Sequence, residues 1–174
     1  MTLVDLLCAS YIALALPNAD MACENMHTVV EAAEEHNVKP SVMVALIHVE
    51  SRWTARAISR SNACGLTQVL PKFSAGYRNR FGKKLTCQQL LDPTTSIKRG
   101  TKILGFFLKR YDRNYRRSLC AYNAGGSRCR PGLKKNKGHR YAAKVLRLAR
   151  KLQLRMNVEE KAYQEEEYVP GCYE

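Results

Sequence analysis

The chain has 174 residues, of which 45% are hydrophobic, and a formal net charge of +14 at pH 7. This length is enough for one domain whose hydrophobic core needs no metal for its stability. The positive charge points to anionic partners, because a basic surface attracts polyanions over a long range.

The charge is divided unevenly along the chain. Residues 1–50 carry a net charge of −6, residues 51–155 carry +25 and residues 156–174 carry −5. The +25 segment is expected to concentrate anionic polymers. Nucleic acid and a phosphate- or carboxylate-bearing cell envelope both fit this description, and charge alone does not choose between them.

Seven cysteines favour an oxidising compartment, periplasmic or extracellular, over the cytosol; they are Cys8, Cys23, Cys64, Cys87, Cys120, Cys129 and Cys172. Buried reduced cysteines are the alternative. Cys120 and Cys129 bracket a short segment that a disulfide would close, and the odd count leaves at least one thiol free or intermolecular. No Cys-x-x-Cys pair and no zinc-like Cys–His spacing occurs, so we expect no metal and no cofactor.

The first apolar segment runs from Leu3 to Leu16 and is interrupted only by Asp5. Two interpretations stay open for residues 1–22: a signal peptide, or an N-terminal helix packed on the domain. Small residues end the segment, as in a signal peptide, but no Lys or Arg precedes it. About 14 residues are too few to cross a bilayer as a helix, so we expect no transmembrane span.

A helix is predicted over residues 23–36, where apolar residues recur at helical spacing, and a second helix begins at Pro40. On the second helix, Met43, Leu46 and Ile47 form an apolar stripe, and the next position of that stripe is Glu50. A carboxylate that continues an apolar stripe is partly desolvated, which raises its pKa toward the range of a general acid. The alternative is that Glu50 marks the point where the helix becomes exposed.

The remaining segments also favour helices, and no strand pattern is convincing. We predict a short helix over residues 66–70 that Pro71 ends, a basic and aromatic surface lobe over residues 72–85, and helices over residues 118–123 and 141–152. A long helix capped near Asp92 is also predicted, with one apolar face formed by Ile97, Thr101, Leu104, Leu108 and Tyr111. Residues 156–174 form an acidic tail, either helical, disordered or folded back on the basic face. The predicted fold class is mainly α.

Four sequence blocks occur in the order and spacing of a known family. They are E-S-x-W-x-x-x-A-x-S followed by A-C-G-L-T-Q from Glu50, the Asp-Pro turn and helix from Leu90, C-A-Y-N-A-G-G from Cys120, and R-Y-A-A-K-V-L-R-L from Arg140. Together they resemble the soluble lytic transglycosylase (SLT) domain of the lysozyme-like superfamily, over roughly residues 24–154. The resemblance implies a helical, goose-type lysozyme-like domain over residues 23–155.

The resemblance also implies the roles of six residues. Glu50 corresponds to the acid/base of the family, and the substrate-binding positions correspond to Ser59, Gln68, Tyr122, Asn123 and Tyr141. For each of the five, a purely structural role is the alternative: a loop hydroxyl, a surface amide, a helix-end residue or a core tyrosine. Trp53 is expected to be a structural wedge rather than a sugar platform.

The chain departs from the family pattern at two positions. Lys39 stands where an Asp often caps the helix before the proline, which costs a cap and places a positive charge at the positive helix end. Thr67 stands where a Met is common, which leaves the local packing or a substrate contact open.

The acids after Glu50 are too few for a two-carboxylate glycosidase. Between Ser51 and Met156 the chain has only Asp92 and Asp112, and both are expected to be structural. Lytic transglycosylases use one carboxylate, with the acetamido group and the 6-hydroxyl of the sugar completing the reaction. The implied activity is therefore cleavage of the N-acetylmuramic acid–N-acetylglucosamine bond with formation of 1,6-anhydromuramic acid.

Two alternatives to this activity stay open. One is a lysozyme-type hydrolase on the same fold. The other is a non-catalytic protein that binds nucleic acid or the envelope, against which the intact Glu50, Gln68 and Tyr122–Asn123 pair argue. The expected partner is peptidoglycan, with acidic envelope polymers or a secretion, conjugation or phage assembly as further partners.

Overall fold

The computed structural model describes residues 1–130, 132 and 136–167, and these residues form helices joined by loops. In chain order the helices are α1 (Leu3–Ala13), α2 (Ala19–Glu24), α3 (Met26–Glu35), α4 (Pro40–Ser51), η1 (Pro71–Phe73), η2 (Tyr77–Asn79), α5 (Cys87–Leu90), α6 (Pro93–Arg110), α7 (Tyr115–Ala124), η3 (Gly126–Cys129) and α8 (Lys137–Glu167). Within the described ranges no helix is both long and apolar enough to cross a membrane. The predicted mainly-α class is confirmed.

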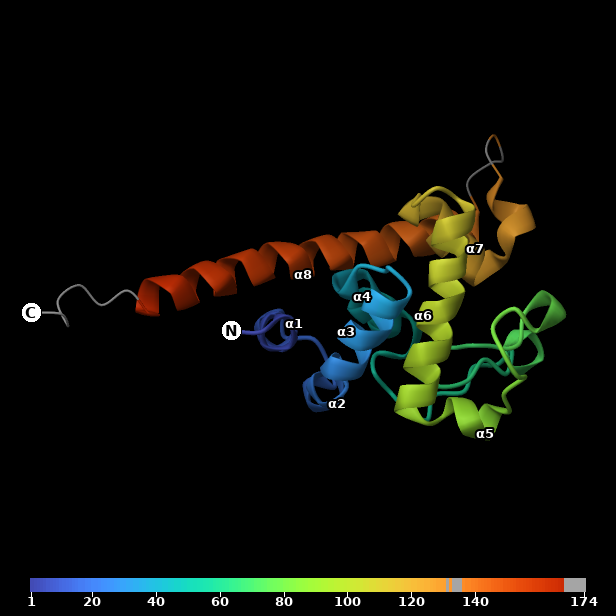
Figure 1. Cartoon of the computed structure of the whole chain (residues 1–174), viewed down its shortest axis with the longest axis horizontal. Coiled ribbons are helices and arrows are strands. Elements are labelled where there is room, and N and C mark those ends of the chain that lie inside the picture. Colours follow the sequence, from blue (N-terminus) through green and yellow to red (C-terminus); the bar gives the residue numbers. More distant parts are fainter. Residues whose placement is uncertain (131, 133–135, 168–174) are drawn as a thin grey trace, which may run out of the picture.

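Helix α4 lies at the centre of the domain. It packs against α3 and α8, while α8 also runs along α1 and α7, and α6 stands upright against α3 and α7 (Figure 1). Every residue of α4 from Ser41 to Ile47 is buried. A helix that is buried on all sides has one fixed position, so the residues at its C-terminal end are held by the whole core.

The apolar stripes of the other helices are buried as predicted. On α6, Ile97, Thr101, Leu104 and Leu108 are fully buried, and the Asp92 side chain caps the helix by accepting a hydrogen bond from the Thr95 amide at 2.8 Å. The helix predicted over residues 23–36 is broken at Asn25, which ends α2 and starts α3.

The prediction of a helix over residues 66–70 is wrong. Gly65 and Gln68 both have positive φ angles, +77° and +50°, and the segment folds as a turn in which Cys64 forms isolated β-bridges with Ile58 and Val69. Pro71 begins the short helix η1 rather than ending a longer one. Positive φ angles are incompatible with a right-handed helix, which explains the difference.

Three disulfides join neighbouring elements: Cys8–Cys23 links α1 to α2, Cys64–Cys87 links the turn to α5, and Cys120–Cys129 links α7 to η3. The predicted closure of the segment between Cys120 and Cys129 is confirmed. Cys172 lies outside the described residues. Such a set of bridges is typical of proteins that fold in an oxidising compartment.

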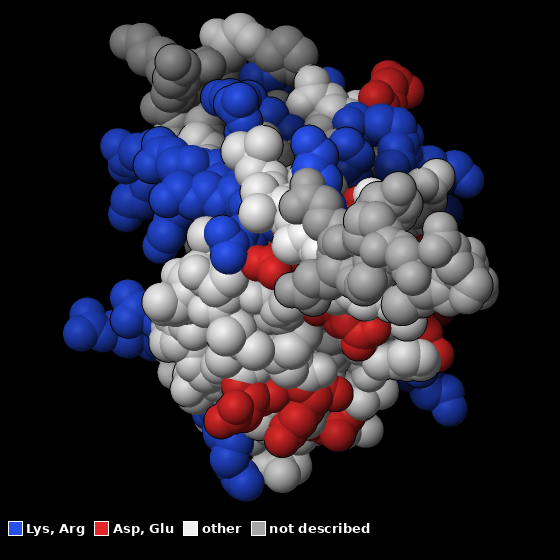
Figure 2. Space-filling model, turned by 90° about the vertical axis from the view of Figure 1, so that its left-hand side faces the viewer, with Lys and Arg blue, Asp and Glu red and all other residues white. Residues whose placement is uncertain are grey.

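The charge division along the sequence is also a division in space. Figure 2 shows Lys and Arg gathered over the upper part of the molecule and Asp and Glu over the lower part. The lower part holds α1, α2 and α3 in Figure 1, and the acidic residues of the first 50 positions belong largely to these helices. Residues 156–167 of the predicted acidic tail continue α8 as a helix to Glu167, and residues 168–174 lie outside the described residues.

Helix α4 begins without a capping side chain. Lys39 is its N-cap with extended backbone angles, φ −69° and ψ 122°, but its side chain makes no capping hydrogen bond. We expect Lys39→Asp to raise the free energy of unfolding by about 1 kcal/mol, because an Asp at this position accepts from the first-turn amides and suits the positive helix end. Urea denaturation at pH 7 measures the change.

Lys39→Ala is the matched control, since it removes the charge without adding a cap. Equal free energies of unfolding for the two variants would show that a capping side chain does not stabilise α4.

Candidate active site

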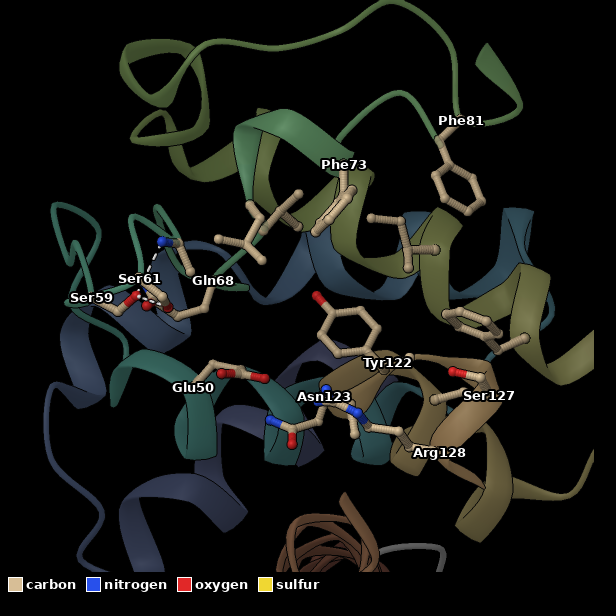
Figure 3. A pocket seen from close by; sticks show the side chains of 18 residues that line it. Glu50, Ser59, Ser61, Gln68, Phe73, Phe81, Tyr122, Asn123, Ser127 and Arg128 are labelled. Carbon is tan, nitrogen blue, oxygen red and sulfur yellow. Dashed lines mark hydrogen bonds between the residues drawn. The ribbon is translucent and has the colours of Figure 1, made fainter. Parts of the chain in front are cut away.

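A cleft of about 790 Å³ opens between the C-terminal end of α4, the turn after it, α6, α7 and η3. In Figure 3, Glu50, Asn123 and Arg128 lie along one wall, and Phe73 and Phe81 lie on the wall opposite. The cleft is lined by Glu50, Ser59, Ser61, Ala63, Gln68, Val69, Leu70, Phe73, Phe81, Ile103, Phe107, Ala121, Tyr122, Asn123, Ala124, Gly125, Ser127 and Arg128. A cleft with one polar and one aromatic wall suits a sugar, which has polar edges and apolar faces.

Glu50 is placed by the buried part of its own helix. It lies in the last turn of α4, about one turn after the fully buried Leu46 and Ile47, and its side chain enters the cleft (Figure 3). Beyond it, Arg52 turns the chain with a φ of +51°, and Trp53 is only 1% exposed. The position of the carboxyl is therefore fixed on both sides by core residues, and the expected wedge role of Trp53 agrees with its burial.

Desolvation dominates the titration of Glu50. Burial raises the pKa of its carboxyl from the usual 4.5 to about 7, although the Tyr141 hydroxyl and the charge of Lys144 both lower it. The carboxyl is thus protonated in a large fraction of molecules near neutral pH. A carboxyl in that state is able to donate a proton near neutral pH.

Tyr141 does not line the cleft, in contrast to the expected substrate-binding position. Its hydroxyl is buried and forms no hydrogen bond with any described residue. The Tyr141 hydroxyl lowers the pKa of Glu50, and burial, followed by the Glu50 carboxylate, raises the Tyr141 pKa well above 10. The phenol therefore stays neutral near pH 7.

Tyr122 and Thr67 form a linked pair beside the cleft. The Tyr122 hydroxyl donates to the Thr67 carbonyl oxygen at 2.8 Å, and the Thr67 hydroxyl donates to the Ser96 carbonyl oxygen at 2.8 Å. Thr67 is fully buried, and a Cβ added to Gly100 would lie 2.5 Å from it. Thr67 therefore holds Tyr122 and packs against α6 without lining the cleft.

Gln68 and Ser59 each have a structural task on the cleft wall. The Gln68 amide nitrogen donates to the carbonyl oxygens of Ala57 and Gly65 at 3.0 and 2.9 Å, which orients its Oε1 as the free acceptor. The Ser59 hydroxyl accepts from the Ala63 amide at 3.0 Å. Both residues hold the turn in shape and also line the cleft, so their substrate-binding roles stay a prediction.

The cleft contains one carboxylate among its described lining residues, that of Glu50. Asp92 caps α6, and Asp112 follows the end of α6 on the surface. Across the described part of the chain, no three His, Cys, Asp or Glu side chains cluster as metal ligands do. With one carboxyl group in its described lining, the cleft can supply proton transfer by a single acid.

The structure thus brings Glu50, Ser59, Gln68, Tyr122 and Asn123 to one cleft. Sequence motifs and periodicity did not indicate that Ser61, Phe73, Phe81, Ile103, Phe107 and Arg128 line the cleft. Phe107 is not one of the residues predicted for the apolar face of α6, and Phe73 and Phe81 belong to the lobe predicted at the surface. Arg128 lies two residues after the C-A-Y-N-A-G-G block, and that position is the one signal for it in the sequence.

Comparisons with known proteins agree on one family. The sequence profile of the transglycosylase SLT domain matches residues 27–145. The soluble lytic murein transglycosylase of Escherichia coli K12 is 32% identical over 103 residues, which are 58% of this chain and 16% of that protein. The membrane-bound lytic murein transglycosylase E of Buchnera aphidicola is 36% identical over 88 residues, 48% of this chain and 39% of that protein.

Solved structures show the same fold. The 70 kDa soluble lytic transglycosylase of Escherichia coli and an inactive mutant of the lytic transglycosylase Slt of Pseudomonas aeruginosa each superpose with a TM-score of 0.67 at 24% identity. Each match covers 75% of this chain and 24% of the other. The chain spans well under half the length of the curated relatives given above. The match over residues 27–145 covers most of the sequence, and the chain belongs to the transglycosylase SLT domain family.

Proposed function

We propose that this protein is a peptidoglycan lytic transglycosylase in which Glu50 is the only acid/base. The observation that carries the proposal is the position of Glu50: it is the one carboxylate lining the described cleft, and burial raises its pKa to about 7. The names of the relatives supply the substrate class, since they are murein transglycosylases.

The first step is protonation of the glycosidic oxygen by the Glu50 carboxyl. The bond from C1 of N-acetylmuramic acid to that oxygen breaks, and the N-acetylglucosamine leaves with the proton. The 2-acetamido oxygen of the muramic sugar stabilises the cationic C1, which takes the place of a second protein carboxylate. Asn123 and the Gln68 Oε1 line the cleft as polar partners for sugar amides and hydroxyls.

The second step returns the proton. The Glu50 carboxylate takes a proton from the 6-hydroxyl of the same sugar, and that oxygen attacks C1 to close a 1,6-anhydro ring. Glu50 is protonated again and no water is consumed. A pKa near 7 suits both steps, because the group must donate and accept a proton in one cycle.

A hydrolase on the same fold is the competing activity. A hydrolase that uses two protein carboxylates needs a second one within about 10 Å of the first, to activate water or to attack C1. The described cleft lining offers none besides Glu50, which favours transglycosylation. The disulfides suit a periplasmic or extracellular enzyme with residues 23–155 as its catalytic domain.

The products test the activity directly. We expect the protein to release muropeptides with 1,6-anhydromuramic ends from purified sacculi, and Glu50→Gln to reduce the rate by about 10²–10⁴-fold, because an amide donates no proton to the leaving oxygen. Mass spectrometry of the released muropeptides distinguishes anhydro ends from reducing ends by one water.

Asp112→Asn is the matched control, since it removes one negative charge outside the cleft. Reducing ends would identify a hydrolase, and full activity of Glu50→Gln would remove Glu50 from the mechanism.

The raised pKa also predicts how stability depends on pH. Below about pH 4.5 Glu50 is largely neutral in both the folded and the unfolded chain. Between about pH 4.5 and pH 7 the carboxyl ionises in the unfolded chain but stays largely protonated in the folded protein, so the free energy of unfolding falls over this range and levels off above pH 7. Glu50→Gln stays neutral throughout. We expect the variant to match the wild type at pH 4 and to be more stable by about 3 kcal/mol at pH 8.

Urea denaturation of both proteins across this pH range measures the difference. A difference that does not change with pH would mean that the Glu50 carboxyl is solvated like any surface acid.

A further inference from the structure

The cleft holds one positive charge in addition to its acid. Among the described lining residues, Arg128 is the only Lys or Arg. It belongs to η3, and Figure 3 shows its side chain extending along the wall that also carries Asn123 and Glu50, with Asn123 between the two charged residues.

The backbone around Arg128 is held from several sides. The side-chain amide of Asn136 donates to the Arg128 carbonyl oxygen at 2.7 Å, and the backbone N–H of Arg128 donates to the Gly125 carbonyl oxygen at 3.2 Å. The next residue, Cys129, is bonded to Cys120 of α7 and is buried. The backbone that carries the guanidinium is therefore fixed, which reduces the entropy lost when the side chain binds a ligand.

No described acid neutralises this guanidinium. The ion pairs in the described part of the chain are His27–Glu31, His36–Glu35 and Arg155–Glu159, and none involves Arg128. By contrast, Arg117, also near η3, donates to the Cys129 carbonyl oxygen and lies over the Tyr111 ring. Arg117 is used within the fold, whereas the exposed Arg128 head group faces the cleft.

We propose that Arg128 forms an anion subsite in the cleft that binds a carboxylate of the glycan substrate. The proposal rests on the proposed function, which supplies a substrate with carboxylates of two kinds: those of the peptide stems, and the lactyl carboxylate that is free once the stem is removed. A planar guanidinium binds a carboxylate through two parallel hydrogen bonds. A glycan of N-acetylglucosamine alone has no such group, so the subsite selects anionic over neutral strands.

Binding measurements in the Glu50→Gln background test the subsite without turnover. Three tetrasaccharides serve as ligands: a muramic-acid-containing one with peptide stems, the same one after amidase removes the stems, and the neutral N-acetylglucosamine tetramer. We expect Arg128→Gln to raise the Kd of the stem-bearing ligand, the stem-free ligand or both by about tenfold, and to leave the neutral ligand within about twofold.

The charged ligand that loses affinity identifies the source of the carboxylate. Arg130→Gln is the matched control, because it removes the same charge two residues away, outside the cleft lining. Equal loss for all three ligands, no loss for either charged ligand, or no measurable binding of the charged ligands would overturn the subsite. Release of anhydro muropeptides by the wild type tests the proposed function separately, so the two failures are distinguishable.

Discussion

The properties of the candidate site depend on the partial removal of one carboxyl group, that of Glu50, from water. A charged carboxylate loses hydration free energy when it is buried, so a buried Glu becomes an acid with a raised pKa. Helix α4 holds Glu50 in this position, because seven consecutive residues from Ser41 to Ile47 are buried before the helix reaches the cleft. After Glu50 in the chain, Trp53 is also buried in the core. The packing of the core therefore raises the pKa of the Glu50 carboxyl.

The polar groups around this acid are fixed by main-chain hydrogen bonds. Tyr122 is tied to a carbonyl oxygen of the turn, Gln68 to two more, and Ser59 to an amide of the same turn. The Cys64–Cys87 and Cys120–Cys129 bridges lie beside these elements. Preorganised donors and acceptors need little rearrangement during a reaction, which suits the cationic sugar of the proposed mechanism. The turn that replaced the predicted helix is therefore part of the site.

Helical periodicity predicted α4, α6 and the burial of their apolar stripes, and the stripe through Leu46 and Ile47 located Glu50. The same pattern failed over residues 66–70, because a positive φ at Gln68 and its bonds to carbonyl oxygens leave no trace in an apolar pattern. The aromatic wall was missed for another reason. Phe73, Phe81 and Phe107 come from separate segments, and only the tertiary fold brings them to one cleft.

Burial raises the pKa of the Glu50 carboxyl to about 7, so a large fraction of the molecules carry this proton near neutral pH. The most direct measurement is an NMR titration of the Glu side-chain ¹³Cδ shifts between pH 3 and pH 9, with Glu50 assigned by the signal that Glu50→Gln removes. The account predicts that this signal titrates with a pKa of about 7. A pKa at the ordinary value of 4.5 would contradict it.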